Sequence, residues 1–113
     1  MSENAEQAAK DLHVEINYQN IAHSDAIDDH VIGTVRSSML RFATRLTRVE
    51  VHLGDENSPQ KSGANDMRCM LEARPAGKDP IAVEEHAEDL YAAIKGASRK
   101  LQRALEKRLD GHG

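Results

Sequence analysis

The chain is poor in aromatic residues and has almost no cysteine. Of its 113 residues, none is Trp, one is Phe and two are Tyr, so the core of a domain must come from Leu, Ile, Val, Met and Ala. The single cysteine, Cys69, excludes an internal disulfide framework and favours a reducing, cytoplasmic location. A chain of this length has the size of one small domain.

Long apolar segments are absent as well. No stretch approaches the roughly 20 consecutive apolar residues of a membrane-spanning helix, so no membrane partner is expected. The first residues are acidic and lack the basic and apolar regions of a secretory signal. Residues 1–10 also show no apolar periodicity, which predicts a flexible N-terminal tail before a single domain at residues 11–110.

An overall excess of positive charge is missing too, because the formal net charge is -4. This value argues against a protein that coats nucleic acid indiscriminately. The basic residues are nevertheless concentrated: residues 31–53 contain one acidic and four basic side chains, and residues 88–113 contain four acidic and six basic ones. Such local sorting is what selective contact with a polyanion requires.

Apolar residues alternate in four short segments, which predicts four β-strands. These segments are residues 12–18, 49–53, 67–73 and 81–83. Helical spacing follows an N-cap signal at Ser24 and continues to Phe42, and it returns over residues 88–109. We therefore expect an α+β fold of order β-α-β-β-β-α, in which two helices pack on one face of a four-stranded sheet. Polar residues 54–65 predict a loop between the second and third strands.

The last predicted helix carries a row of basic residues beside its apolar stripe. Lys95, Arg99, Arg103 and Lys107 recur every four residues. A neighbouring row adds Lys100 and Arg108. A charged helix face is most often simply solvated. The alternative interpretation is an anion-binding edge, best suited to nucleic acid.

The same helix carries the motif that relates the chain to a known family. Its most specific segments run from Glu88 to Ile94 (EDLYAAI) and from Lys100 to Arg103 (KLQR), with Lys107 beyond them. Within residues 12–109, the chain resembles the short, single-domain form of the hibernation-promoting factor and ribosome-associated inhibitor family. The resemblance implies a domain that binds the small ribosomal subunit and its ribosomal RNA, and covers the sites of messenger and transfer RNA. Inhibition is then by occlusion, without an enzymatic reaction or a small-molecule substrate.

The resemblance also implies RNA-binding positions, residue by residue. Lys100, Arg103 and Lys107 match recurrent basic positions of the family's second helix. In the first helix, Asp28 and Thr34 stand where relatives frequently have Arg or Lys. From charge alone we infer that arginines further along the chain replace those positions. The complete candidate RNA-binding set is Lys95, Arg99, Lys100, Arg103, Lys107, Arg108, Arg36, Arg41 and Arg45.

Two other classes of function find less support. The acidic balance and the missing bases of the first helix motivate one alternative, a protein-interaction module of the same fold that has lost ribosome binding. A small enzyme is the other, but no motif assigns a catalytic residue. Cys69 alternates with Met67 and Leu71, which predicts a buried apolar role for its side chain.

The remaining residues with chemical potential are the histidines and Tyr91. The six histidines lack the close paired spacing of a zinc site, so neither a metal nor a cofactor is expected. Tyr91 can stack on a base, but the favoured interpretation is that it packs on the apolar side of its helix.

Overall fold

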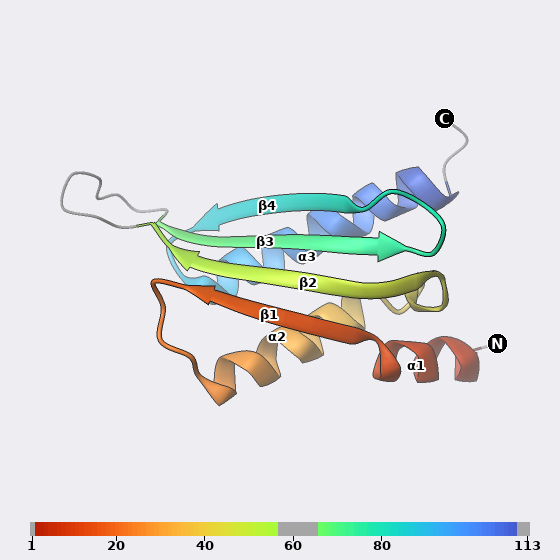
Figure 1. Cartoon of the computed structure of the whole chain (residues 1–113), viewed down its shortest axis with the longest axis horizontal. Helices are drawn as coiled ribbons and strands as arrows, with labels where there is room; N and C mark the ends of the chain where they lie inside the picture. Colours follow the sequence, from red (N-terminus) through yellow and green to blue (C-terminus); the bar gives the residue numbers. More distant parts are fainter. Residues whose placement is uncertain (1, 57–65, 111–113) are drawn as a thin grey trace.

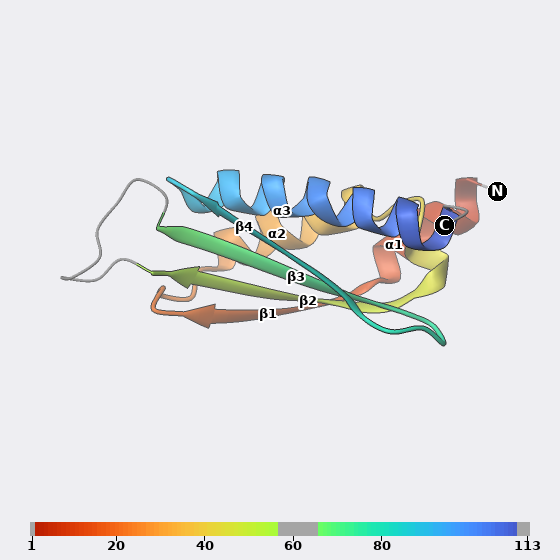
Figure 2. The same cartoon turned by 90° about the horizontal axis from the view of Figure 1, so that it is seen from above.

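A four-stranded sheet forms one layer of the molecule, and helices cover one of its faces (Figures 1 and 2). The structure, a computed structural model, describes residues 2–56 and 66–110. In chain order the elements are α1 (Ser2–Asp11), β1 (His13–Gln19), α2 (Asp25–Ser38), the 3-10 turn η1 (Ala43–Arg45), β2 (Leu46–Asp55), β3 (Met67–Pro75), β4 (Ile81–Ala87), α3 (Leu90–Leu105) and the π-helical turn η2 (Glu106–Asp110).

The strands lie in the order β1-β2-β3-β4. β1 and β2 are parallel and are connected through α2, whereas the β2–β3 and β3–β4 pairs are antiparallel. This arrangement confirms the predicted α+β class and the predicted order of strands and covering helices. A crossover through a helix is the connection that parallel neighbours require.

The core lies between the sheet and the two covering helices. One row across the sheet pairs Ile16, Val51, Leu71 and Val83 from the four strands, all on the helix side. Because side chains alternate along a strand, this register places every second row of paired residues on the helix side. α3 packs chiefly on β3 and β4, and it also contacts α2.

Side-chain caps define where the two covering helices begin. The Ser24 hydroxyl accepts a hydrogen bond from the backbone N–H of Ile27 at 3.3 Å, and the Asp89 carboxylate accepts one from Ala92 at 2.8 Å. Each satisfies a backbone donor that the first helical turn leaves unpaired. α2 and α3 run in the same direction, so both begin at one end of the sheet and end at the other (Figure 1).

The predicted flexible tail was wrong for the described residues 2–10, which belong to helix α1. The helix packs against η1 at one end of the sheet, with Ala9 buried and Leu12 buried just beyond it. Its apolar face consists of alanines, which favour helix but add no large side chains to a periodicity pattern. The predicted pair of helices therefore covers the sheet, with α1 as an addition.

The first covering helix was also predicted too long. α2 ends at Ser38, and the chain then turns through η1 into β2. Met39 and Phe42 are nevertheless fully buried, at 0% and 2% exposure, so their apolar character reflects the core and not a continuing helix. As a result, Arg41 and Arg45 lie on the connection between α2 and β2.

Candidate nucleic-acid interface

The outer side of α3 presents an uninterrupted row of positive charge. The inner side is buried, since Ile94, Ala97 and Leu101 are fully shielded from solvent. Lys95, Arg99 and Arg103 of α3 and Lys107 of the adjoining turn η2 are exposed and follow each other every four residues. Within an α-helix such a step rises about 6 Å along the axis and turns about 40° round it, so the row crosses the outer side obliquely. We call these four residues the α3 basic row.

The side chains of the α3 basic row have no hydrogen-bond or ion-pair partner within residues 2–56 and 66–110. Their charges are therefore not neutralised by this part of the chain, and they are exposed to solvent. Long cationic side chains on a rigid helix are suited to contact phosphates at fixed spacing. Of the nine candidate RNA-binding residues, the four of the α3 basic row are therefore available to bind an external anion.

Lys100 has an internal structural role instead. Its ammonium group donates to the Glu84 carbonyl at 2.8 Å and pairs with a Glu85 carboxylate oxygen at 2.9 Å. The Lys100 hydrogen bond holds the pKa of Glu85 below its ordinary value. Gly96 makes room for this contact, because a Cβ atom there would lie 2.5 Å from a Glu85 carboxylate oxygen. Lys100 thus ties α3 to β4.

The other basic candidates connect segments at the end of the sheet where α2 and α3 finish. The Arg36 guanidinium donates twice to the Leu12 carbonyl, at 3.2 and 3.1 Å. Arg41 pairs with Glu106 at 2.6 Å, and its guanidinium lies 5.0 Å from the Phe42 ring centroid.

Two further arginines bind backbone carbonyls at this end. Arg45 donates to the Leu109 carbonyl at 3.1 Å, and Arg108 donates to the Asp79 carbonyl at 3.3 Å. Together with Arg36 and Arg41, they join the α1–β1 and α2–β2 connections, the β3–β4 turn and η2. Sequence charge brought these residues into the candidate set, and the structure shows that each also contacts another segment of the fold.

The outer side of α2 contrasts with the basic row of α3. Asp25, Asp29 and His30 are exposed along it, and Gly33 and Ser37 continue the same surface. An open groove runs along this face between Asp29 and Ser38. Arg36 is the basic residue of this helix, and it is occupied with Leu12. α2 therefore contributes an acidic to neutral margin.

Tyr91 lies at the margin between the two helices and was predicted wrongly. Its side chain is 48% exposed, and its ring meets that of His30 edge-on at 4.5 Å between centroids. The expected packing on the apolar side of α3 is absent. The available sequence signal was spacing, because Tyr91 precedes Lys95 by four residues and is in step with the basic row rather than with the buried stripe.

The opposite face of the sheet carries a balanced network of charges. Glu50 of β2 pairs with Arg48 at 2.6 Å and with Arg74 of β3 at 3.5 Å. Arg68 bonds to Glu84, and this hydrogen bond lowers the pKa of the Glu84 carboxyl. Within the described strands, no Phe, Tyr or Trp side chain faces outward on this surface. The face therefore lacks the stacking platform that sheet-based RNA binders use.

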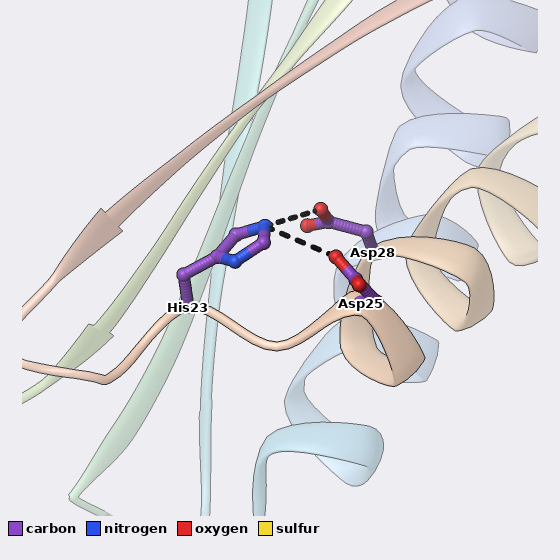
Figure 3. Close-up of side chains that lie close together, drawn as sticks. All are labelled: His23, Asp25 and Asp28. Carbon is purple, nitrogen blue, oxygen red and sulfur yellow. Dashed lines mark hydrogen bonds and ion pairs between the residues drawn. The ribbon is translucent and has the colours of Figure 1, made fainter.

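One group of side chains has the proximity that a metal ion requires (Figure 3). The His23 ring nitrogen lies 2.7 Å from Asp28 and 3.8 Å from Asp25, and Tyr18 donates to the other Asp28 oxygen at 2.6 Å. The Tyr18 hydrogen bond lowers the pKa of Asp28, whereas burial and Asp28 raise the pKa of Tyr18 to about 12. These contacts already satisfy Asp28, and the positive end of the α2 dipole disfavours a cation. We interpret the group as a set of structural contacts that hold the start of α2 against β1.

Two further expectations concern Cys69 and the membrane. Cys69 is fully buried on β3, as predicted, and burial raises the pKa of its thiol to about 12. A thiol in this state has too little thiolate to act as a nucleophile near neutral pH. None of the described helices has the length and apolar character needed to cross a membrane.

The comparisons with known proteins relate this chain to ribosomal factors. The family model described as sigma 54 modulation protein / S30EA ribosomal protein matches residues 14–111. A ribosome hibernation promotion factor from Picosynechococcus sp. is 30% identical over 92 residues, which span 81% of this chain and 46% of that protein. The chloroplastic ribosome-binding factor PSRP1 of Spinacia oleracea is 29% identical over 98 residues, which span 84% of this chain and 32% of that protein. The chain thus spans half or less of the curated relatives.

Solved structures confirm the fold. A ribosomal subunit interface protein from Coxiella burnetii superposes with a TM-score of 0.68 at 13% identity, covering 86% of this chain and 97% of its own. The N-terminal domain of Thermus thermophilus Protein Y superposes with a TM-score of 0.65 at 26% identity, with the same coverage of both chains. With the family match over nearly the whole sequence, these results show that the chain belongs to the S30EA ribosomal protein family, the hibernation-promoting factors that its terminal helix resembles.

Proposed function

We propose that this protein is a ribosome-associated translation inhibitor that binds the small ribosomal subunit. The α3 basic row contacts ribosomal RNA phosphates, and the bound domain occupies the sites of messenger and transfer RNA. The observation that carries the proposal is the row itself, four exposed cations without partners in the described structure, which runs obliquely across the outer side of α3 and ends in η2. Membership of the hibernation-factor family supports the same partner.

The mechanism requires binding and no chemical step. Lys and Arg side chains that replace counterions around a phosphate backbone release those ions, so the affinity depends steeply on salt. With four contacts, log K falls against log salt with a slope of about -3 to -4. Because α3 is held to the sheet by its buried stripe and by Lys100, it presents these cations in a fixed geometry.

A second candidate function is a protein-interaction module of the same fold. The observation in its favour is the outer side of α2, where Asp25 and Asp29 are exposed and Arg36 is engaged with Leu12. An acidic margin of this kind weakens attraction to RNA and suits a basic protein partner. The two candidates differ in whether the row of α3 or the margin of α2 governs binding.

Sedimentation with isolated small ribosomal subunits in a sucrose gradient tests the proposal. At low salt the protein should travel with the subunits, and at high salt it should remain at the top. Arg103→Glu should lose co-sedimentation, whereas Lys10→Glu, the same charge reversal on exposed α1, should retain it. Absence of the wild-type protein from the subunit peak at low salt overturns the proposal. Equal loss in both variants would show that net charge, and not the row, governs binding.

A further inference from the structure

Tyr91 stands at the head of the α3 basic row. Counting from it in steps of four gives Lys95, Arg99, Arg103 and Lys107. Because each step turns about 40° round an α-helix, the row is oblique: it starts at Tyr91 on the α2 side and reaches the β4 side at Lys107. The ring is 48% exposed, and its hydroxyl has no hydrogen-bond partner in the parts of the chain that the structure describes. An aromatic side chain thus continues the track of unpaired charges.

The position of this ring is unusual for the chain. The other Tyr and the single Phe of the chain serve the fold. Phe42 is buried, and Tyr18 packs against the core and donates a hydrogen bond to Asp28. Tyr91 instead meets the edge of an exposed histidine, with the His30 and Tyr91 rings inclined by 72°. The Thr34 hydroxyl lies 3.5 Å from the His30 ring and supports it in turn. The ring of Tyr91 is therefore held in place without being buried.

We propose that Tyr91 stacks on an unpaired base of an RNA strand whose phosphates follow the α3 basic row. The inference rests on the proposed function of the row and names the kind of RNA that the row accepts. A cationic track combined with an exposed aromatic ring is the arrangement by which proteins hold single strands. Every base has a face that can stack, so this contact selects for unpaired RNA rather than for a sequence.

The surroundings of the row favour a single strand over a duplex. A duplex presents two phosphate backbones, and a second backbone beside α3 would approach α2. The outer side of α2 exposes Asp25 and Asp29, which repel phosphate. On the other flank Lys100 is occupied with Glu84 and Glu85. One helix therefore provides one track, with an aromatic ring at its N-terminal end.

The chain offers a direct readout, because it contains two tyrosines and no tryptophan. Titration with an unstructured single-stranded oligoribonucleotide at low salt should quench the emission of exposed Tyr91. In parallel, binding of a labelled oligoribonucleotide should weaken about 5- to 100-fold in Tyr91→Ala, the range expected for losing one stacked base. Tyr91→Phe keeps the aromatic face and should bind within about twofold of the wild type.

Leu40→Ala is the matched control, because Leu40 is the other large apolar side chain exposed in the described structure and lies off the row. It should leave affinity and quenching unchanged, and thermal unfolding should show that every variant is folded. A duplex of the same length should bind more weakly than the single strand.

Four results overturn the inference: no binding of the single strand at low salt, equal affinity of Tyr91→Ala, unchanged tyrosine emission, or a duplex bound as tightly. The proposed function fails separately. Loss of co-sedimentation with small subunits, together with intact single-strand binding and quenching, would refute the ribosomal target and leave the role of Tyr91 standing. Normal co-sedimentation of Tyr91→Ala with unchanged oligonucleotide affinity would refute the role of Tyr91 and leave the ribosomal target standing.

Discussion

α2 and α3 perform the same structural task but present different outer surfaces. Both begin with a side-chain cap, run in the same direction and cover one face of the sheet (Figure 2). Their inner sides are apolar in both cases, with Val31 and Val35 in α2 and Leu101 and Leu105 in α3. On the outside, α2 is acidic to neutral, whereas α3 carries the basic row.

The difference shows how function is separated from folding in this small domain. The sheet demands an apolar inner stripe from each helix, because buried area supplies most of the stability. It makes no demand on the outer side, which can vary without loss of the core. The outer side of α3 is therefore the place where a charge pattern can be attributed to a partner.

The largest expected effects come from the inner sides, where the two helices should behave alike. Leu101→Ala should lower the free energy of unfolding by about 2–5 kcal/mol, because it removes a fully buried side chain and leaves a cavity. Val35→Ala on α2 should cost about 2 kcal/mol, since fewer buried groups are lost. Urea unfolding followed by circular dichroism measures both. A change below about 0.5 kcal/mol at either site would contradict the shared structural role.

Charge changes on the outer sides should separate the helices. At about 0.1 M salt, Arg99→Ala should weaken RNA binding about five- to eightfold and flatten the salt slope by about one, because one phosphate contact is lost. Thr34→Lys adds a cation to the α2 margin, away from the row, and should change the slope by much less than one because no phosphate contact is gained.

These two variants are compared by binding titrations at several salt concentrations. Lys10→Ala, a neutralisation on α1 away from the row, serves as the control for net charge. An equal change of the salt slope in Arg99→Ala and Lys10→Ala would mean that net charge, and not the basic row, determines RNA binding.

The acidic start of α2 should show its structural role through pH. Tyr18 and His23 hold the pKa of Asp28 below its ordinary value in the folded protein. The stabilisation is therefore present above the unfolded pKa of about 3.9 and is lost as the pH falls through the folded pKa. Asp28→Asn should be less stable than the wild type at pH 7, and the difference should shrink below about pH 4. Unfolding in urea across this pH range measures it, and a constant difference would exclude the carboxylate as its source.

The smallest effects are expected from one glycine on each helix. A Cβ at Gly33 of α2 meets nothing within 4 Å, so Gly33→Ala should stabilise by about 0.5–1 kcal/mol through helix propensity. At Gly96 of α3 the same change displaces the Glu85 side chain and disturbs its pair with Lys100. Gly96→Ala should therefore show less gain or a loss. Thermal unfolding of both variants compares them, and an equal gain would show that Glu85 moves freely.

Much of the fold was predictable from local patterns. Alternation over residues 49–53 and 67–73 identified the two central strands, and the cap Ser24 lies where the sequence placed the start of α2. α3 begins at Leu90, two residues after the predicted start, because Asp89 caps the helix and does not belong to its first turn. These features depend on neighbours within a few positions, where periodicity and capping chemistry are informative. Helix α1 escaped prediction because its buried face is made of alanine, which is common in any segment.

The candidate interface was predictable only in part. The row from Lys95 to Lys107 follows from a spacing of four, and the structure places it on the outer side of α3. The contacts of Arg41 with Glu106, and of Arg45 with Leu109, join residues more than 60 positions apart in the chain. No local pattern indicates such partners. The exposure of Tyr91 was likewise a matter of how α3 is rotated against α2.

The sequence by itself determined the order of elements, the buried stripes and the family motif at the start of α3. These follow from the period of a strand or helix and from the residue types within it. Only the tertiary structure decided which cations stay unpaired, because ion pairs depend on distances between elements and not on spacing along the chain. It paired Lys100 with β4, set Arg36 against the residue before β1, and left one exposed aromatic ring at the head of an oblique row of four charges.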